Sequence, residues 1–445
     1  MPSSRDRKAL GRGGALRKLS RVVVINDASS AFGGATGIAL LSIRLYRARG
    51  IDVTFIVGDS GDNAEPTALG AEVVSVGGRQ LMNETPLVAA MRGIYNPAAN
   101  RTLRSWMASS DTANTVYHVH GWSKILSPSI FDALRPVASR TVVHAHDFFL
   151  ACPNGGFMDY VAGRPCSRAP LSFDCLKTNC DKRSYAQKMW RVARQLALQK
   201  SFDFHSQGAK ILMIHEKMAD LLIRSGYPRD RLVTVRNPAT GFTAKRIPAE
   251  RNRAIYFVGR LEAEKGIEDA ITAAKRAKVP FKVIGDGPLR PRLSSAFPDV
   301  QFLGWNSRER IADLLADARA LVMPSRYPEP YGLVVAEASQ SGLPIVLSAS
   351  AFLAQEVVDK GIGFSCNTQD ADALSALFAR LDGMSSDEIR VMSERAFSNV
   401  AHLSNTPDRW ADELLAIYEE RISAAAAWKA STIPAGLAWH PGLKL

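Results

Sequence analysis

The residues best suited to bind or act on a ligand begin with two cations in the second half of the chain. Arg260 ends the β-branched run 254–260, and Lys265 follows five positions later, at the expected start of a helix. Two fixed cations at the carboxyl end of a parallel strand can bind a diphosphate from one side. The Gly-Asp-Gly-Pro turn at 285–288 follows another strand-like run and is expected at the same edge of the sheet. Exposed pairs of cations are common, so these residues indicate a phosphate site only in combination with others.

Two glutamates follow in a segment rich in proline and glycine. Glu329 lies in the turn itself, and Glu337 lies about two turns into a helix that is expected to start near Gly332. Carboxylates accept hydrogen bonds from sugar hydroxyls, and the N–H groups of Gly332, Leu333 and Val334 would face a phosphate at the helix N-terminus. Either glutamate alone would be interpreted as a cap or a solvated side chain. Together with the two cations, they predict a site for a ribose and a second sugar joined through phosphate.

The first half of the chain has a glycine-rich turn after its first strand-like run, 21–26. Gly33, Gly34 and Gly37 form the pattern Gly-Gly-x-x-Gly, which lets the backbone approach a phosphate closely. The pattern differs from Gly-x-Gly-x-x-Gly, and no acidic residue ends a well-placed second strand, so it is a weak dinucleotide signature. A plain tight turn explains these glycines equally well.

Four of the five cysteines lie close together in the sequence. Cys152, Cys166, Cys175 and Cys180 are separated by 13, 8 and 4 residues, whereas Cys366 stands alone. This is not a standard zinc-finger or zinc-ribbon spacing, but four thiolates could meet at one structural zinc ion if the segment folds back on itself. Reduced cysteines that simply pack within a loop are the alternative.

Continuous β-branched runs such as 53–58 and 281–287 alternate with amphipathic segments along almost the whole chain. Such runs suit parallel strands covered on both faces, so we expect an α/β fold with two Rossmann-like domains. A segment with prolines, a glycine and charges interrupts the series and indicates a linker. The expected organisation is a basic, disordered leader (1–20), a first domain (21–240), the linker (241–253), a second domain (254–405), a helix that packs back toward the first domain (406–430) and a loose tail (431–445).

The composition is that of a folded protein in water, with 46% hydrophobic and 22% charged residues among 445. It excludes a collagen-like or wholly disordered chain, and no stretch of about 20 apolar residues could span a membrane. The formal net charge of +13 is uneven, because residues 1–21 hold seven basic residues and one acidic residue. This leader is either solvated or in contact with an anionic membrane. Because basic residues are not interleaved with aromatic ones, we expect no nucleic-acid partner.

The segment 182–200 predicts a basic amphipathic helix. One face would carry Tyr185, Met189, Val192, Ala193 and Leu196, with Arg183, Lys188, Arg191 and Arg194 roughly opposite or on the flank. Such a helix either packs its apolar face into a core or lies on an anionic membrane. No apolar segment follows the basic leader, so we expect no secretory signal. The expected location is the cytoplasm, including peripheral contact with the inner face of the cell membrane.

The second half carries four motifs in order: GRLEAEKG (259–266), GDGPLRPRL (285–293), VQFLGW (300–305) and MPSRYPEPYGLVVAEASQSGLPIV (323–346). They resemble the motifs of the retaining glycosyltransferases of family 4, which have the GT-B fold of two Rossmann-like domains facing each other across a cleft. In the first half, VHAHDFFLACPN (143–154) is similar to the family's His-Asp strand end. The resemblance covers roughly residues 21–420 and is most specific in the second half.

The resemblance also implies roles for individual residues. Arg260 and Lys265 would bind the diphosphate of the donor and stabilise it as it leaves. Glu337 would hold the nucleotide ribose, and Glu329 would contact hydroxyls of the transferred sugar.

In the first domain, Gly33 and Gly34 would bring the backbone to the phosphate across the cleft. His146 matches the family histidine near the reacting face of the donor sugar, with His118 and His120 as second choices. Some of these histidines would serve only to hydrogen-bond the backbone.

The implied reaction transfers a sugar from a nucleotide-diphosphate donor to a glycan or lipid-linked acceptor, as in the synthesis of cell-envelope polysaccharide. No metal or other cofactor would be required, since the leaving phosphate oxygen would take the acceptor proton and fixed donors would stabilise the charge. The Asp370-Ala371-Asp372 triplet is better interpreted as a helix cap than as a metal site. The alternatives are a sugar-nucleotide epimerase or phosphorylase of the same fold and a non-catalytic sugar-nucleotide binder. A phosphorylase would require a pyridoxal lysine motif, and none is evident.

Overall fold

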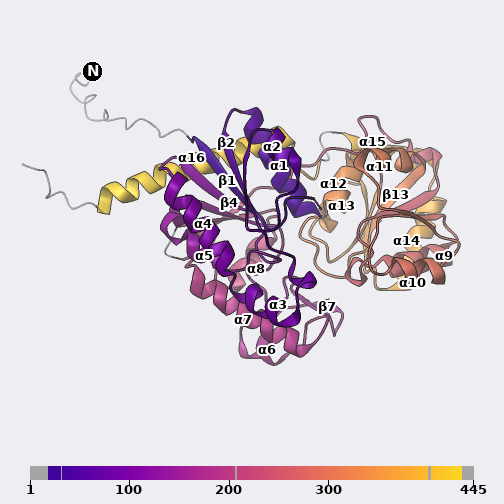
Figure 1. Cartoon of the computed structure of the whole chain (residues 1–445). Helices are drawn as coiled ribbons and strands as arrows, with labels where there is room; N and C mark the ends of the chain where they lie inside the picture. The colour runs from indigo at the N-terminus through magenta and orange to yellow at the C-terminus, as the bar shows by residue number, and fades with distance from the viewer. Residues whose placement is uncertain (1–18, 32, 206–207, 399–401, 433–445) are drawn as a thin grey trace, which may run out of the picture.

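The protein consists of two α/β domains that lie side by side in a computed structural model (Figure 1). The structure describes residues 19–31, 33–205, 208–398 and 402–432. Most of the expected leader and tail therefore lies outside the described residues. None of the helices in the described ranges is long and apolar enough to cross a membrane.

The first domain is built on a sheet of seven parallel strands in the order β3-β2-β1-β4-β5-β8-β9. Alternate residues of β1 are buried on opposite faces: Val22 and Val24 pack in one apolar cluster, and Val23 and Ile25 in another. Both faces are thus covered, which explains the continuous apolar runs in the sequence. The strands are β1 (Arg21–Asn26), β2 (Asp52–Val57), β3 (Glu72–Ser75), β4 (Thr115–Val119), β5 (Thr141–Ala145), β8 (Lys210–Met213) and β9 (Leu232–Thr234).

The helices of this domain are α1 (Gly34–Ala48), α2 (Ala64–Ala68), α3 (Pro86–Ile94), α4 (Pro97–Ser110), α5 (Ser129–Leu134), α6 (Phe173–Lys177), α7 (Tyr185–Ser201) and α8 (Met218–Arg224). Between β5 and β8 the chain makes a long excursion with a two-stranded hairpin, β6 (Met158–Asp159) and β7 (Arg164–Pro165), followed by α6 and α7. This excursion carries the four clustered cysteines, and it lies on the lower side of the first domain in Figure 1.

The second domain has a parallel sheet in the order β12-β11-β10-β13-β14-β15. Its strands are β10 (Ala254–Val258), β11 (Phe281–Ile284), β12 (Gln301–Gly304), β13 (Ala318–Met323), β14 (Ile345–Ser348) and β15 (Gly363–Cys366). Its helices are α9 (Ile267–Ala277), α10 (Arg290–Ala296), α11 (Arg308–Leu314), α12 (Leu333–Ser339), α13 (Ala354–Asp359), α14 (Ala371–Gly383) and α15 (Ser386–Phe397). The side chain of Asp370 accepts the N–H groups of Asp372 and Ala373, which confirms this triplet as the cap of α14.

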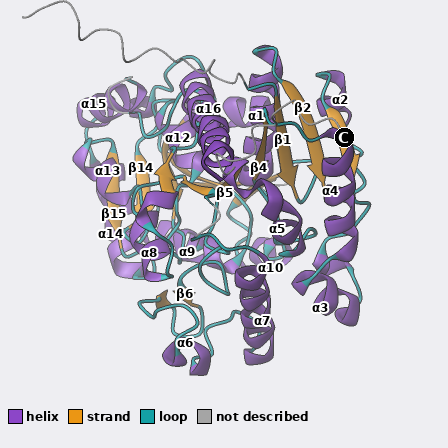
Figure 2. Ribbon diagram, turned by 90° about the vertical axis from the view of Figure 1, so that its left-hand side faces the viewer, coloured by secondary structure: helices purple, strands orange, loops and turns teal. Residues whose placement is uncertain are grey.

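The last helix, α16 (Pro407–Thr432), follows the second domain in sequence but packs on the first. Trp410, Leu414, Tyr418 and Ile422 share an apolar cluster with residues of β1, β2 and α1. Figure 2 shows α16 running beside α1 and β4. The four residues recur every four positions, so one stripe of the helix covers the open face of the first sheet.

Candidate functional site

A cavity of about 770 Å³ lies between the two domains. The second domain contributes Arg260, Glu262, Glu264, Lys265 and Tyr327, all near the carboxyl ends of β10 and β13. The first domain contributes side chains of α3, α7 and the loops after β4 and β5. Ligands of parallel α/β sheets bind outside the carboxyl ends of the strands, so this cleft is the candidate site.

Lys265 is held in the cleft by two side chains. Its Nζ donates to Glu329 Oε2 at 2.7 Å and to the Tyr327 hydroxyl at 2.9 Å. Ser325 also donates to Glu329 Oε2, at 2.9 Å. Burial acts to raise the pKa of Glu329, but the charge and hydrogen bond of Lys265, with those of Tyr327 and Ser325, outweigh it and lower that pKa. Glu329 is therefore an ionised acceptor at neutral pH, held in place by three side chains.

The side chain of Arg260 is more exposed than that of Lys265. It is 57% exposed and donates to Glu262 at 2.7 Å, within the loop that follows β10. The backbone beside it is tightly packed, because a Cβ on Gly285 would lie 1.9 Å from the carbonyl oxygen of Gly259. The Gly-Asp-Gly-Pro turn thus lies directly against the Arg260 loop, as expected for one edge of the sheet. An exposed guanidinium on a fixed backbone is free to turn toward an anion in the cleft.

Glu337 has a different partner from Glu329. It lies on α12, one turn rather than two after Gly332, and accepts from Arg308 Nη1 at 2.5 Å. Arg308 also donates to the carbonyl oxygens of Thr240 and Gly241, where the first domain meets the linker. Burial raises the pKa of Glu337 even though the Arg308 charge opposes that shift. The sequence pattern missed Arg308, which lies far from the glutamate in the chain.

Gly33 and Gly34 lie at the start of α1, on the first-domain side of the boundary between the domains. A Cβ on Gly34 would come within 3.1 Å of Leu333 Cδ1, at the start of α12. Leu333 and Val334 are both partly buried, and Leu333 packs against both apolar clusters of the first domain. The two turns therefore approach closely, but none of these residues lines the 770 Å³ cavity. Since α12 has only seven residues, its N-terminus is a small contribution to anion binding.

The four histidines at the ends of β4 and β5 form one stacked array. His118 Nε2 lies 3.2 Å from His144 Nδ1, and His120 Nδ1 lies 3.0 Å from His146 Nε2. Burial, followed by the neighbouring imidazoles, lowers the pKa of His118, His120 and His144 well below the usual value, so these three are neutral at pH 7. His146 does not line the cavity, whereas the next residue, Asp147, does.

Two groups of described side chains have a spacing suited to a metal ion: His118, His120 and His144, and His215, Glu216 and Glu356. Both are hydrogen-bonded networks as they stand. The Tyr418 hydroxyl lies 2.6 Å from His118 Nδ1, and His215 Nε2 lies 3.1 Å from Glu356 Oε1.

The four clustered cysteines are all free thiols in the excursion after β5. Cys152, Cys175 and Cys180 are buried, and Cys166 is partly exposed. No three of their sulfur atoms lie within 4.8 Å of one another in the described part of the chain. A zinc ion with Zn–S bonds of about 2.3 Å would require the loop to tighten, so the zinc site stays a prediction.

Of the two alternatives for 182–200, packing of the apolar face into the core is wrong, because only Val192 of that face is buried, whereas contact with a membrane stays a prediction. Lys188, Arg194 and Gln195 are buried in α7, whereas Tyr185, Met189 and Leu196 are 43%, 38% and 52% exposed. Lys188 donates to the carbonyl oxygens of Cys175 and Thr178, so the excursion around α6 supplies its partners. The helical pattern considers only where apolar residues recur. A polar side chain such as that of Lys188 can still be buried where tertiary contacts satisfy its hydrogen bonds.

Arg194 is a further cleft residue that the sequence did not reveal. It is buried, donates to the Ser123 carbonyl at 3.0 Å and lies over the rings of Phe149, Trp190 and Trp122 at 4.8, 5.2 and 5.8 Å. Burial lowers its pKa to about 10, which leaves it charged at pH 7. The first domain thus offers the cleft a fixed cation opposite Lys265.

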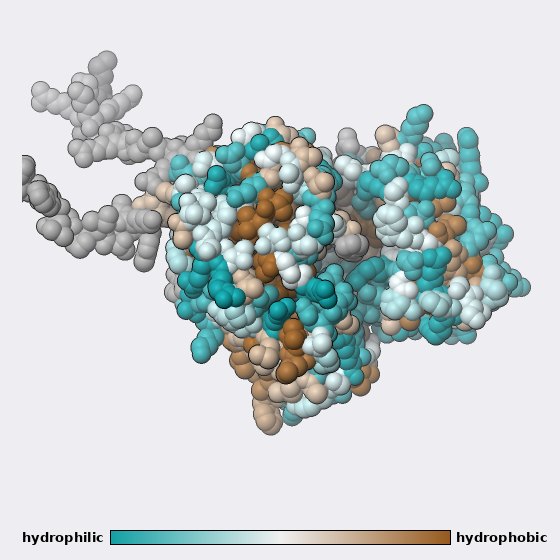
Figure 3. Space-filling model, viewed as in Figure 1, coloured by the Kyte–Doolittle hydropathy of each residue, from teal (hydrophilic) through white to brown (hydrophobic). Residues whose placement is uncertain are grey.

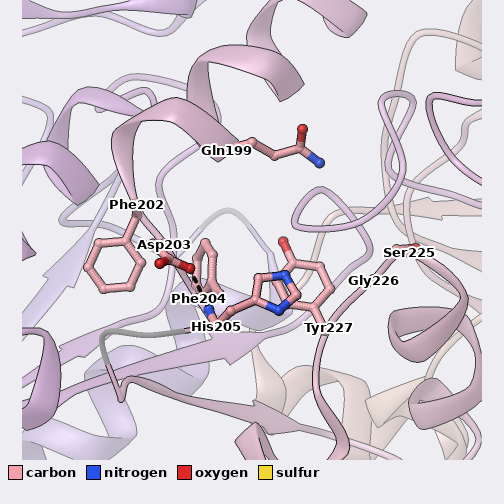
Figure 4. A pocket seen from close by; sticks show the side chains of 8 residues that line it. All are labelled: Gln199, Phe202, Asp203, Phe204, His205, Ser225, Gly226 and Tyr227. Carbon is pink, nitrogen blue, oxygen red and sulfur yellow. Dashed lines mark hydrogen bonds between the residues drawn. The ribbon is translucent and has the colours of Figure 1, made fainter.

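A smaller hollow of about 190 Å³ lies within the first domain, away from the cleft (Figure 4). Its walls are the end of α7 and the turn after α8, with Phe202, Phe204 and Tyr227. These rings pack edge to face, with centroids 4.8 and 5.3 Å apart, as part of the apolar core. The hollow has no cluster of charged groups comparable with that of the cleft.

Comparison with known protein families identifies both domains. Residues 242–396 match the family described as "Glycosyl transferases group 1", and residues 33–238 match "Glycosyl transferase 4-like domain". These two matches together span most of the chain, which belongs to the GT-B glycosyltransferases of the family 4 type.

Individual relatives are more distant. The chain is 34% identical over 167 residues to a glycogen synthase of Mycobacterium tuberculosis, a match that spans 35% of this chain and 38% of that protein. Among solved structures, a sucrose-phosphate synthase from Thermosynechococcus elongatus superposes with a TM-score of 0.66 at 16% identity, over 91% of this chain and all of that one. The Anabaena protein HepE, solved in complex with UDP, gives 0.59 at 14% identity, over 92% and 100% of the two chains. At such identities the structures establish the fold alone.

Proposed function

We propose that the protein transfers a sugar from a nucleotide-diphosphate donor to a glycan or lipid-linked acceptor, in the synthesis of a cell-envelope polysaccharide. The observation that carries the proposal is that Arg260 and Lys265 line one interdomain cleft at the carboxyl end of β10. Family membership and the HepE complex, which holds UDP, also support a nucleotide-sugar donor.

The chemistry follows from the charge that develops in glycosyl transfer. The transition state resembles an oxocarbenium ion while negative charge builds on the leaving diphosphate. Arg260 and Lys265 are the cations placed to stabilise that charge, and Glu329 can accept hydrogen bonds from hydroxyls of the transferred sugar. Glu337, oriented by Arg308, would hold the ribose of the donor.

We further propose that the reaction retains the anomeric configuration and needs no metal ion. Acceptor attack on the face from which the diphosphate leaves would let a phosphate oxygen take the acceptor proton, so no carboxylate nucleophile is required. The product anomer, identified by NMR, tests retention, and unchanged turnover in EDTA tests metal independence.

The donor site is tested by calorimetric titration with UDP, GDP and ADP. We expect one nucleotide to bind in the micromolar range and Arg260→Ala to weaken that binding at least tenfold, about 1.4 kcal/mol. Arg253→Ala is the matched control, because Arg253 is an exposed arginine at the opposite end of the same strand, where it pairs with Asp382. Binding that is lost equally in both variants, or absent for all three nucleotides, would contradict the proposed donor site.

The zinc hypothesis has a separate test. Metal analysis of the purified protein is expected to give one zinc per chain, and this zinc should be lost in Cys175→Ser but kept in Cys366→Ser. Protein purified without zinc, and unable to take it up, would remove the hypothesis.

A further inference from the structure

The outer face of α7 is apolar and largely uncovered in the described structure, where the Tyr185 hydroxyl donates to the Leu176 carbonyl at 2.9 Å and the side chains of Met189 and Leu196 are exposed. Tyr185, Met189 and Leu196 recur at intervals of four and seven residues, so they lie along one stripe of the helix. All three are more than a third exposed, because the buried side of α7 is the one that carries Lys188 and Arg194. A contiguous apolar patch that is exposed on a folded domain marks a candidate interaction site.

Helix α3 extends this apolar surface. Trp190 of α7 donates to the Ala90 carbonyl at 2.9 Å, and a Cβ on Gly93 would lie 2.4 Å from the Trp190 ring, so the two helices are in close contact. Leu87 and Met91 of α3 are 72% and 65% exposed. Hydrophobic residues gather over α3 and α7 at the lower side of the first domain (Figure 3). We call the exposed side chains Leu87, Met91, Tyr185, Met189 and Leu196 the α3–α7 surface.

The charge of these helices selects the kind of partner. Neither α3 nor α7 contains an acidic residue. Lys188 and Arg194 of α7 are buried, Arg191 pairs with Asp181, and Arg92 of α3 pairs with Glu84. Lys200 is therefore the exposed cation of α7 that pairs with no acidic residue in the described part of the chain. Arg183, just before α7, is exposed and donates to the sulfur of Met82 rather than to a carboxylate. An exposed apolar surface on helices without acidic residues, with the exposed cations Arg183 and Lys200 at the two ends of α7, matches the boundary between the headgroups and acyl chains of an anionic bilayer.

The same two helices form a wall of the cleft. Ala89 and Ala90 of α3 and Gln187 and Trp190 of α7 line the 770 Å³ cavity that also holds Arg260 and Lys265. At the rim, Lys182 pairs with Glu264 of the second domain at 2.5 Å. A molecule anchored at the α3–α7 surface would therefore be within reach of the cleft without leaving the lipid.

We propose that the α3–α7 surface docks the protein on an anionic lipid bilayer, and that the acceptor is an amphiphile whose polar head enters the cleft from that bilayer. The docking stands on the exposed apolar stripe and the charge of the two helices. The nature of the acceptor rests in addition on the proposed glycosyl transfer.

Vesicle flotation of the full chain tests the docking. With vesicles of phosphatidylcholine and phosphatidylglycerol at 7:3, we expect most of the protein to float, and at least fivefold less to float with phosphatidylcholine alone. Leu87→Ser/Met91→Ser/Met189→Ser should reduce the floated fraction at least fivefold. Val358→Ser/Val391→Ser, which removes two exposed apolar side chains of the second domain, should leave it unchanged. Equal flotation of the triple variant and the parent would overturn the proposal.

The same experiment distinguishes two alternatives to membrane docking through the α3–α7 surface. If the basic residues at 5–12 bind the membrane instead, Arg5→Ser/Arg7→Ser/Lys8→Ser/Arg12→Ser would abolish flotation while the triple variant still floats. If the surface joins two copies of the chain, the triple variant would shift a dimer to a monomer in size-exclusion chromatography and float like the parent. Either result overturns the docking.

Nucleotide titration of the triple variant separates this proposal from the proposed function. Unchanged nucleotide affinity with lost flotation supports docking by a folded protein. A parent protein that floats but binds none of UDP, GDP and ADP would leave the docking intact and remove the donor site. A soluble, lipid-free glycan that is glycosylated as fast as a lipid-linked one on vesicles would overturn the amphiphilic acceptor.

Discussion

In the second domain Lys265 faces the cleft and donates to Glu329, whereas in the first domain Lys188 is buried and donates to two backbone carbonyls. Both lysines lie in segments that carry several cations, and both have fixed partners. The difference lies in the partner and its place. Lys265 lines the ligand cavity and pairs with a carboxylate, whereas Lys188 donates to carbonyls inside the α6–α7 excursion. The comparison shows that a conspicuous basic residue marks a binding site only where its surroundings leave room for an anion.

The largest effect predicted from this comparison is a loss of activity when Lys265 is replaced. Lys265→Ala should lower kcat/KM for the donor about 10³-fold, about 4 kcal/mol, because the leaving diphosphate loses a fixed cation. Steady-state kinetics measures the change. Lys275→Ala is the control, since Lys275 is an exposed lysine on the neighbouring helix α9 that pairs with Asp299. An equal loss in both variants would mean that Lys265 has no special role.

Lys188 should show the opposite behaviour. Lys188→Ala leaves the carbonyl oxygens of Cys175 and Thr178 without their donor in a buried setting. The free energy of unfolding should fall by about 3 kcal/mol, measured by chemical denaturation, with nucleotide affinity unchanged. Lys200→Ala, at the exposed end of the same helix, should change stability by less than about 0.5 kcal/mol. Weakened nucleotide binding in folded Lys188→Ala would break the comparison.

A third test addresses the contact between the domains. Burial acts to raise the pKa of Glu356 on α13, but hydrogen bonds from His215 and Arg236 of the first domain outweigh it and lower the pKa to about 2. The folded-state pKa is depressed, so this stabilisation is present above about pH 4.5 and is lost as the pH falls toward 2.

Glu356→Gln should therefore be less stable than the parent by about 2 kcal/mol at pH 7, after allowance for partial exposure. The difference should shrink toward zero by about pH 2. Chemical denaturation at several pH values measures it. A difference that stays constant across this range would show that the carboxylate charge is not what joins the domains.

The smallest effect is expected where α16 joins the first domain. The Tyr418 hydroxyl lies 2.7 Å from the Tyr46 hydroxyl and 2.6 Å from His118 Nδ1. Tyr418→Phe should cost about 1 kcal/mol of unfolding free energy. A double-mutant cycle with Tyr46→Phe should show coupling, because the two hydroxyls share one hydrogen bond. Strict additivity would show that this pair contributes nothing.

Much of the fold could be predicted from the sequence, because apolar periodicity is local. The strand-like runs at 21–26 and 254–260 become β1 and β10, with the second run ending two residues earlier than expected. Two cations of the cleft and the partner of Lys265 were also recognisable, since Arg260, Lys265 and Glu329 lie in short motifs next to strand ends. Other partners were not: Arg308 reaches Glu337 from another helix, and Lys182 reaches Glu264 across the cleft.

The sequence by itself determined that two parallel α/β sheets form and that cations follow β10. The periodicity of apolar residues and the residue types of turns depend only on residues close together in the chain. Only the tertiary structure decided which side of α7 is buried, which charges are paired, and which glycine turns line the cleft. Those outcomes depend on contacts between residues far apart in the chain, such as Lys188 with the excursion around α6. Burial is decided by whether a partner satisfies each polar group, and no local pattern contains that partner.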